Sequence, residues 1–175
     1  MSARLEPLAP DGRMRTDLQR GEQPLTIFRT LAHHPRLMRK VMALGNRFLF
    51  DGNLLDARAR EIMILRGAYR TGSVYEFGQH TLIGEREGLS AEEIARLARP
   101  DPGTWPGRER TLVTVVDELV DTDTLSDTTW AALRAEHDDA TIVEILLLPG
   151  FYRMLAGFLN ATGVEREPET PGWPA

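Results

Sequence analysis

The chain has 175 residues, a formal net charge of −5 and no cysteine. Its length suits one domain with a buried core, and its 42% hydrophobic and 27% charged residues are ordinary for a soluble globular protein. Scattered basic residues argue against a nucleic-acid partner, and the lack of cysteine excludes disulfides, thiolate catalysis and thiolate metal sites.

Three segments are expected along the chain. Residues 1–23 are rich in proline, glycine and charge, so we predict a flexible arm or one that embraces a partner. Residues 24–165 form a helical domain, and residues 166–175 a C-terminal tail.

No segment predicts secretion or a membrane partner. The first residues lack the apolar stretch of a signal peptide. The longest apolar run, Val143 to Phe158, is broken by Pro149, Gly150 and Arg153 and is expected to be too short to span a bilayer. We therefore expect a cytoplasmic protein.

The first clear helix carries an apolar stripe. Leu37, Val41, Leu44 and Phe48 recur at helical spacing, and Pro35 suits the first turn.

Two further helices are joined by a short connection. Asp56 is suited to cap a helix that reaches Tyr69 and ends near Gly72, and the next helix runs from Ser73 to Gly88. Because short connections join antiparallel neighbours, the two helices should pack side by side.

The second half of the chain also predicts helices. Ser90 and Glu93 form a capping box, residues 101–107 form a loop, and Ser126 caps a short helix. An apolar stripe between the loop and Ser126 marks another helix, with Leu112, Val115, Val116, Leu119 and Val120. No run alternates with period two for long enough to predict a strand. The fold is therefore expected to be all-α, with about seven helices.

The last helix, from about Ala140 to Ala161, is apolar nearly all round, and Pro149 predicts a kink in it. Together with the stripe that begins at Leu37, it presents more apolar surface than a soluble monomer usually exposes. We therefore expect an obligate homo-oligomer.

The candidate site lies on the helix pair that meets at Gly72. Ser73, Glu76 and His80 fall within roughly 60° of one another on one helical face. The antiparallel neighbour can bring the carboxylate of Glu61 toward them, and a buried carboxylate beside an imidazole suits general acid–base catalysis. Tyr75 lies on a different side of its helix.

Each of these residues also has a structural interpretation. Glu76 and His80 are four residues apart, which is the spacing of a surface hydrogen-bonded pair. Ser73 stands at the start of a helix, where serine commonly acts as an N-cap. Glu61 and Arg66 can form a buried ion pair. Two carboxylates and a histidine can alternatively hold a divalent metal, although their spacing is weak evidence for one.

The segments Leu55–Arg66 and Gly72–His80 resemble the carboxymuconolactone decarboxylase family, which includes alkyl hydroperoxidase D. The resemblance covers roughly residues 25–164 and continues through residues 88–94, 108–110, 117–119 and 150–155. It implies an all-helical fold that works as a homo-oligomer, usually a trimer or hexamer, with sites close to subunit contacts.

The resemblance also implies roles for the candidate residues. Ser73 and Glu76 stand where the peroxidase branch has its Cys-x-x-Cys pair, and His80 and Glu61 match that branch's histidine and proton-relay glutamate. Tyr75 occupies the intervening relay position. The acid–base residues are thus kept while the redox pair is absent, so this chain is not a cysteine peroxidase.

The sequence therefore predicts a cofactor-independent acid–base enzyme, a decarboxylase, isomerase or lactone-processing enzyme, acting on a small organic acid or carbonyl compound. His80 would be the main base or acid, with Glu76 as its partner and Glu61 as the orienting carboxylate. Tyr75 and Ser73 would donate hydrogen bonds to a developing oxyanion. The alternatives are a non-catalytic oligomeric or ligand-binding protein, and a metal-dependent enzyme using Glu61, Glu76 and His80.

Overall fold

The structure is a computed structural model that describes residues 3–10, 19–20, 23–50 and 52–174. In these ranges the chain forms eight helices: α1 (Thr26–Leu31), α2 (Pro35–Leu49), α3 (Ala57–Arg70), α4 (Val74–Arg86), α5 (Ala91–Leu97), α6 (Gly107–Thr122), α7 (Asp127–Glu136) and α8 (Asp139–Thr162). The predicted all-α fold is confirmed. The additional helix is α1, whose six residues are too few to show a clear helical period in the sequence.

Two short strands precede α1. β1 (Gln19–Arg20) pairs antiparallel with β2 (Gln23–Pro24). No strand was predicted, because a two-residue ladder is too short to leave an alternating pattern.

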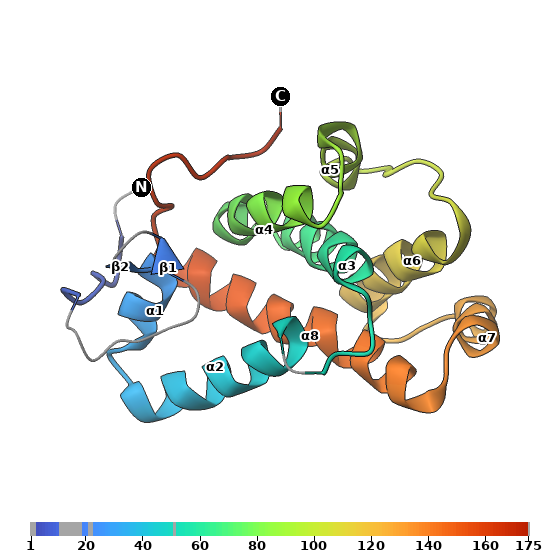
Figure 1. Cartoon of the computed structure of the whole chain (residues 1–175), viewed down its shortest axis with the longest axis horizontal. Coiled ribbons are helices and arrows are strands. Elements are labelled where there is room, and N and C mark those ends of the chain that lie inside the picture. Colours follow the sequence, from blue (N-terminus) through green and yellow to red (C-terminus); the bar gives the residue numbers. More distant parts are fainter. Residues whose placement is uncertain (1–2, 11–18, 21–22, 51, 175) are drawn as a thin grey trace.

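Helix α3 is the centre of the molecule and packs against α4, α5, α6 and α8 (Figure 1). Every residue from Ala59 to Arg66 is buried, as expected for a helix covered on several sides. The helix begins where predicted, because the Asp56 side chain accepts a hydrogen bond from the backbone N–H of Ala59 at 2.8 Å. This central helix carries Glu61 into the interior.

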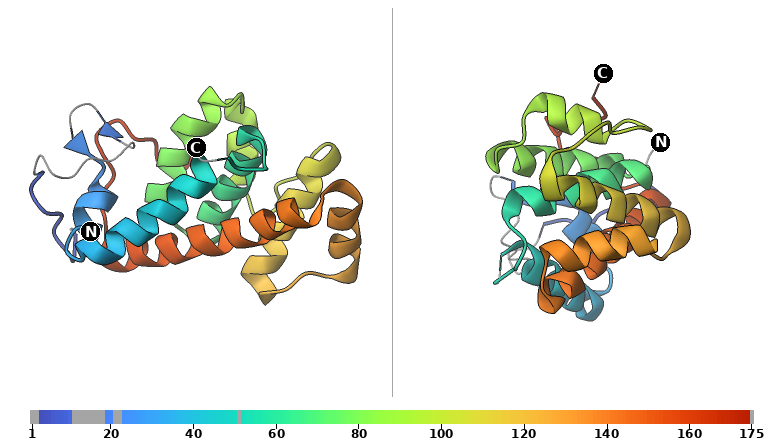
Figure 2. Two further views of the ribbon diagram at one scale, coloured as in Figure 1. Left: turned by 60° about the horizontal axis from the view of Figure 1, so that its bottom comes forward. Right: turned by 90° about the vertical axis from the view of Figure 1, so that its right-hand side faces the viewer.

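Helix α8 runs along much of the molecule beneath α3 and α4 (Figures 1 and 2). It has 24 residues and passes through Pro149 as one helix. By length and composition alone it is long enough to cross a membrane, so the expectation that the apolar run is too short was wrong. Half of its most apolar window is nevertheless buried inside the protein, as in the central helix of a packed core.

The described start of the predicted N-terminal arm contacts its own chain. The backbone N–H of Arg4 donates to the Thr162 carbonyl at 2.8 Å, and the N–H of Leu8 donates to the Arg29 carbonyl at 3.2 Å. Most of the rest of this arm lies outside the described residues.

Candidate active site

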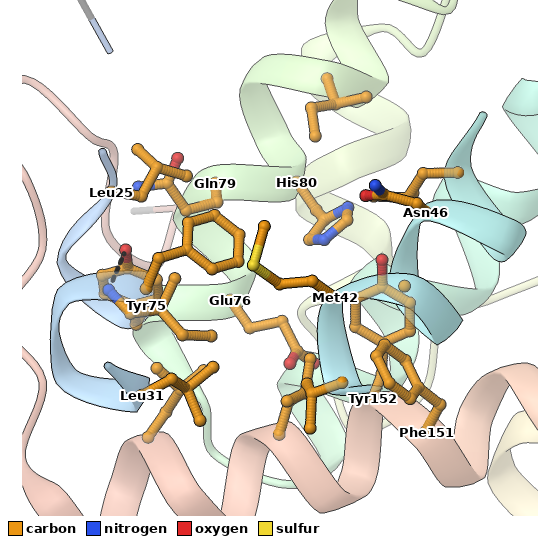
Figure 3. A pocket seen from close by; sticks show the side chains of 18 of the residues that line it. Leu25, Leu31, Met42, Asn46, Tyr75, Glu76, Gln79, His80, Phe151 and Tyr152 are labelled. Carbon is orange, nitrogen blue, oxygen red and sulfur yellow. Dashed lines mark hydrogen bonds between the residues drawn. The ribbon is translucent and has the colours of Figure 1, made fainter. Parts of the chain in front are cut away.

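A cavity of about 240 Å³ lies between α1, α2, α4 and α8 (Figure 3). Most of its wall is apolar and comes from leucine, isoleucine, valine, methionine and phenylalanine side chains. The polar groups on the wall are Asn46, Tyr75, Glu76, Gln79, His80, Arg86 and Tyr152. An apolar cavity with a few convergent polar groups is typical of a small-molecule site.

His80 and Glu61 form a buried pair at the edge of this cavity. The His80 Nδ1 atom lies 2.6 Å from Glu61 Oε2, and the Glu61 side chain is fully buried. The other Glu61 oxygen, Oε1, lies 3.4 Å from the Arg60 Nε atom. Because the carboxylate accepts a hydrogen bond from Nδ1, the Nε2 atom of the ring is left for a ligand. The structure thus brings Glu61 and His80 together as the antiparallel helix pair predicted.

Glu76 lies in the same cavity without a protein partner. Neither carboxyl oxygen has a hydrogen bond to the described residues, and the side chain is buried. Burial raises the pKa of this carboxyl well above its usual value of 4.5. The group is therefore protonated over a wide pH range and offers an O–H donor to a ligand.

Tyr152 was not predicted as a site residue. Its ring makes an edge-to-face contact with the His80 imidazole, with 5.0 Å between centroids, and both side chains face the cavity in Figure 3. Burial raises the pKa of the Tyr152 hydroxyl well above its usual value, and the nearby Glu61 carboxylate raises it further. The hydroxyl therefore stays protonated and can donate a hydrogen bond. The only sequence signal was its place within the family-like segment 150–155.

Tyr75 and Ser73 do not offer free hydroxyls to the cavity. The Tyr75 ring lines it, but the hydroxyl donates to Glu167 Oε1 at 2.9 Å and accepts from the Ile27 N–H at 3.2 Å. Ser73 is buried at the N-cap position of α4 without a capping hydrogen bond, and it is not among the described lining residues. The Tyr152 hydroxyl is thus better placed than either to meet a ligand.

The structure also rules out two of the structural interpretations of these residues, the surface Glu76–His80 pair and the Glu61–Arg66 ion pair. Glu76 and His80 do not form a surface pair, because both are buried and His80 bonds to Glu61. Arg66 bonds to Asp117 at 2.7 Å, so the Glu61–Arg66 ion pair was a wrong expectation. Within the described ranges, no group of three or more acidic or histidine side chains is arranged to hold a metal ion.

No protein-family model matches the chain, and no curated protein sequence matches it. Its fold is similar to that of solved structures. One is a peroxidase-related protein with an alkylhydroperoxidase AhpD core from Ralstonia eutropha JMP134, 18% identical over 86% of this chain and 80% of that chain, with a TM-score of 0.77. A peroxidase-related protein from Silicibacter sp. TM1040 is 16% identical over 97% of both chains, with a TM-score of 0.80.

A third similar structure is the debrominase Bmp8, a cysteine-to-alanine variant in complex with 2,3,4-tribromopyrrole. It is 12% identical over 96% of this chain and 94% of that chain, with a TM-score of 0.69. The fold predicted from the family resemblance is thus confirmed, and the chain has the alkylhydroperoxidase AhpD-like helical fold.

Proposed function

We propose that this protein is an acid–base enzyme that transfers protons on a small, mainly apolar organic molecule carrying a carbonyl or carboxyl group, without a redox cofactor. The observation that carries the proposal is the Glu61–His80 pair at the edge of a cavity that also holds the unpartnered carboxyl of Glu76. A buried carboxyl with a raised pKa, such as Glu76, in a cavity that also contains a histidine is typical of a catalytic site.

The groups suit a proton abstraction next to a carbonyl. The Nε2 atom of His80 takes a proton from the carbon, and the electron pair of the C–H bond moves toward the carbonyl oxygen. The protonated Glu76 and the Tyr152 hydroxyl then donate hydrogen bonds to the oxygen that gains negative charge. Return of the proton to another carbon completes an isomerisation. In a decarboxylation, loss of carbon dioxide supplies the electron pair instead, and the histidine delivers the proton.

The cavity limits the substrate in size and polarity. Its volume of about 240 Å³ suits a molecule of one ring or a short chain. The debrominase of similar fold holds a single substituted ring, 2,3,4-tribromopyrrole. Arg86 is the only arginine or lysine on the described lining and makes no ion pair with the described residues, so it suits a substrate carboxylate.

Proton exchange in D₂O tests the proposal directly. We expect the protein to exchange a carbon-bound hydrogen for deuterium, or to release carbon dioxide, with at least one member of a panel of small keto acids, enones and lactones, as followed by ¹H NMR. The activity should survive dialysis against a chelator. If dialysis abolished the activity and added metal restored it, the metal-dependent alternative would be favoured. Binding of panel members with no exchange and no carbon dioxide release would favour a ligand-binding protein.

We further propose that copies of this chain associate through an exposed stripe on α8. The stripe repeats at intervals of four and three residues, as in a coiled coil, and consists of Val143, Leu147, Gly150, Met154, Gly157 and Ala161. Val143, Leu147 and Met154 are each more than half exposed. A Cβ atom added at Gly150 or Gly157 would meet nothing within 4 Å, so another backbone can approach closely.

Light scattering at low micromolar concentration should therefore report a multiple of 19.7 kDa. Leu147→Lys should shift the protein toward the monomer, because it places a charge on the apolar stripe. Ala131→Lys, on an exposed position of α7, is the matched control. A folded wild-type monomer under these conditions would contradict the proposal.

A further inference from the structure

The residues that follow α8 pack closely against the helix that carries the site. We call residues 165–174 the C-terminal strap. The ring of Trp173 lies 4.9 Å from that of Phe77 and 5.8 Å from that of Tyr69, and Thr170 is buried. In Figure 1 this segment leaves the end of α8 beside β1 and runs above α4 toward the C-terminus. The strap therefore belongs to the packed structure, although the sequence marked these residues only as a tail.

A glycine in α4, Gly78, leaves room for the strap to pack against this helix. A Cβ atom at Gly78 would lie 2.2 Å from the Pro171 carbonyl oxygen and 2.8 Å from Thr170 Cγ2. Glycine is unfavourable in the middle of a helix, so its presence there calls for a packing reason. The close approach of the strap supplies that reason.

Glu167 connects the strap to two walls of the cavity. One carboxylate oxygen accepts hydrogen bonds from the Thr26 N–H at 2.6 Å and the Tyr75 hydroxyl at 2.9 Å, and the other accepts from the Gln79 amide. Thr26 is the first residue of α1, and the N-cap residue Leu25 supplies no side-chain cap. Glu167 therefore satisfies a free N–H group at the start of α1 and ties this helix to α4.

Helix α1 is the part of the cavity wall that depends most on this connection. Ile27 and Phe28 line the cavity, and they pack in one small cluster with Tyr75, Leu159 and Val164. Isolated helices of this length are unstable, so α1 relies on its surroundings.

We infer that the C-terminal strap holds α1 over the cavity and so limits the size of the molecule that the cavity accepts, with Glu167 as the positioning residue. The inference rests on the proposed function only in treating the cavity as the substrate site. Release of Glu167 should loosen α1 while α6 and α7, which lie at the other end of the molecule in Figure 2, keep their structure.

Hydrogen–deuterium exchange measured by mass spectrometry tests the strap without a known substrate. In Glu167→Ala, the amides of residues 26–31 should exchange about tenfold faster or more, because local opening becomes easier, while those of α6 stay unchanged. Glu167→Gln keeps one accepting oxygen and should restore part of the protection.

A second variant tests the contact between the strap and α4. Gly78→Ala should free the strap and speed tryptic cleavage after Arg166. Gly67→Ala, a helix glycine where the added Cβ atom makes only an ordinary 3.9 Å contact, is the control.

A binding series tests the size limit. Ligand-detected NMR with straight-chain carboxylic acids of increasing length should show a longer maximum length for Glu167→Ala than for wild type. The inference would be overturned if Glu167→Ala left the exchange of residues 26–31 unchanged or raised exchange evenly over the whole chain. It would also be overturned if α1 became looser but the longest acid that binds stayed the same. Failure of every acid to bind to wild type would instead count against the proposed function, while the exchange data would still decide whether the strap holds α1.

Discussion

His80→Ala is expected to lower kcat for the proton-transfer reaction about 10²-fold or more, since a positioned general acid or base contributes at least that much. The variant should remain folded, because the imidazole is replaced by a smaller side chain at the edge of an existing cavity. The measurement is the initial rate of deuterium exchange for the best substrate of the panel, with circular dichroism as the test of folding. His33→Ala, an exposed histidine bonded to the Glu6 carbonyl, is the control and should keep wild-type activity.

The same assay separates orientation from charge in the Glu61–His80 pair. Glu61→Gln keeps an oxygen that can accept the Nδ1–H hydrogen bond, whereas Glu61→Ala removes it. If the carboxylate mainly orients the ring, kcat should fall in the order wild type, Gln, Ala. Equal rates in His80→Ala and wild type would show that the pair is structural.

Glu76→Gln is expected to raise the free energy of unfolding at neutral pH and to lower turnover at the same time. The buried carboxyl has a raised pKa in the folded protein, whereas in the unfolded chain it ionises near its ordinary value of 4.5. Between these two pKa values the unfolded state loses a proton that the folded state keeps. Stability from this group is therefore fully present below about pH 4.5 and is lost as pH rises toward the folded pKa.

Urea unfolding from pH 4 to pH 9 measures this effect. Within the window, the wild-type free energy of unfolding should fall relative to that of Glu76→Gln by up to about 1.4 kcal/mol per pH unit. Glu92→Gln, a change at an exposed carboxyl, should leave the pH profile unchanged. Parallel curves for wild type and Glu76→Gln would mean that Glu76 ionises normally in the folded protein.

The local signals in the sequence predicted most of the fold and the approach of Glu61 to His80. The caps at Asp56, Ser90 and Ser126 place three helix starts, because capping depends on residues a few positions apart. The short connection at Gly72 predicted that Glu61 and His80 lie close together, because two helices joined by so few residues pack side by side.

The parts that were missed depend on contacts between distant segments. Tyr152 reaches the cavity from α8, and Glu167 reaches Thr26 across 141 positions of sequence. Neither spacing nor composition reveals such a contact in a single sequence. The four-residue spacing of Glu76 and His80 also gave no indication that Glu76 would lack a hydrogen-bond partner among the described residues, because that depends on which side chains fill the space around it.

The place of α8 in the molecule has a consequence for biosynthesis. This helix packs against α2, α3, α4, α6 and α7, and it contributes Phe151 and Tyr152 to the cavity. Domains generally fold as units during synthesis, with N-terminal elements made first. Here the earlier helices leave the ribosome before the helix that covers them has been made. Their apolar faces stay uncovered until α8 has also emerged, so the cavity can bind a ligand only after this helix has packed against them.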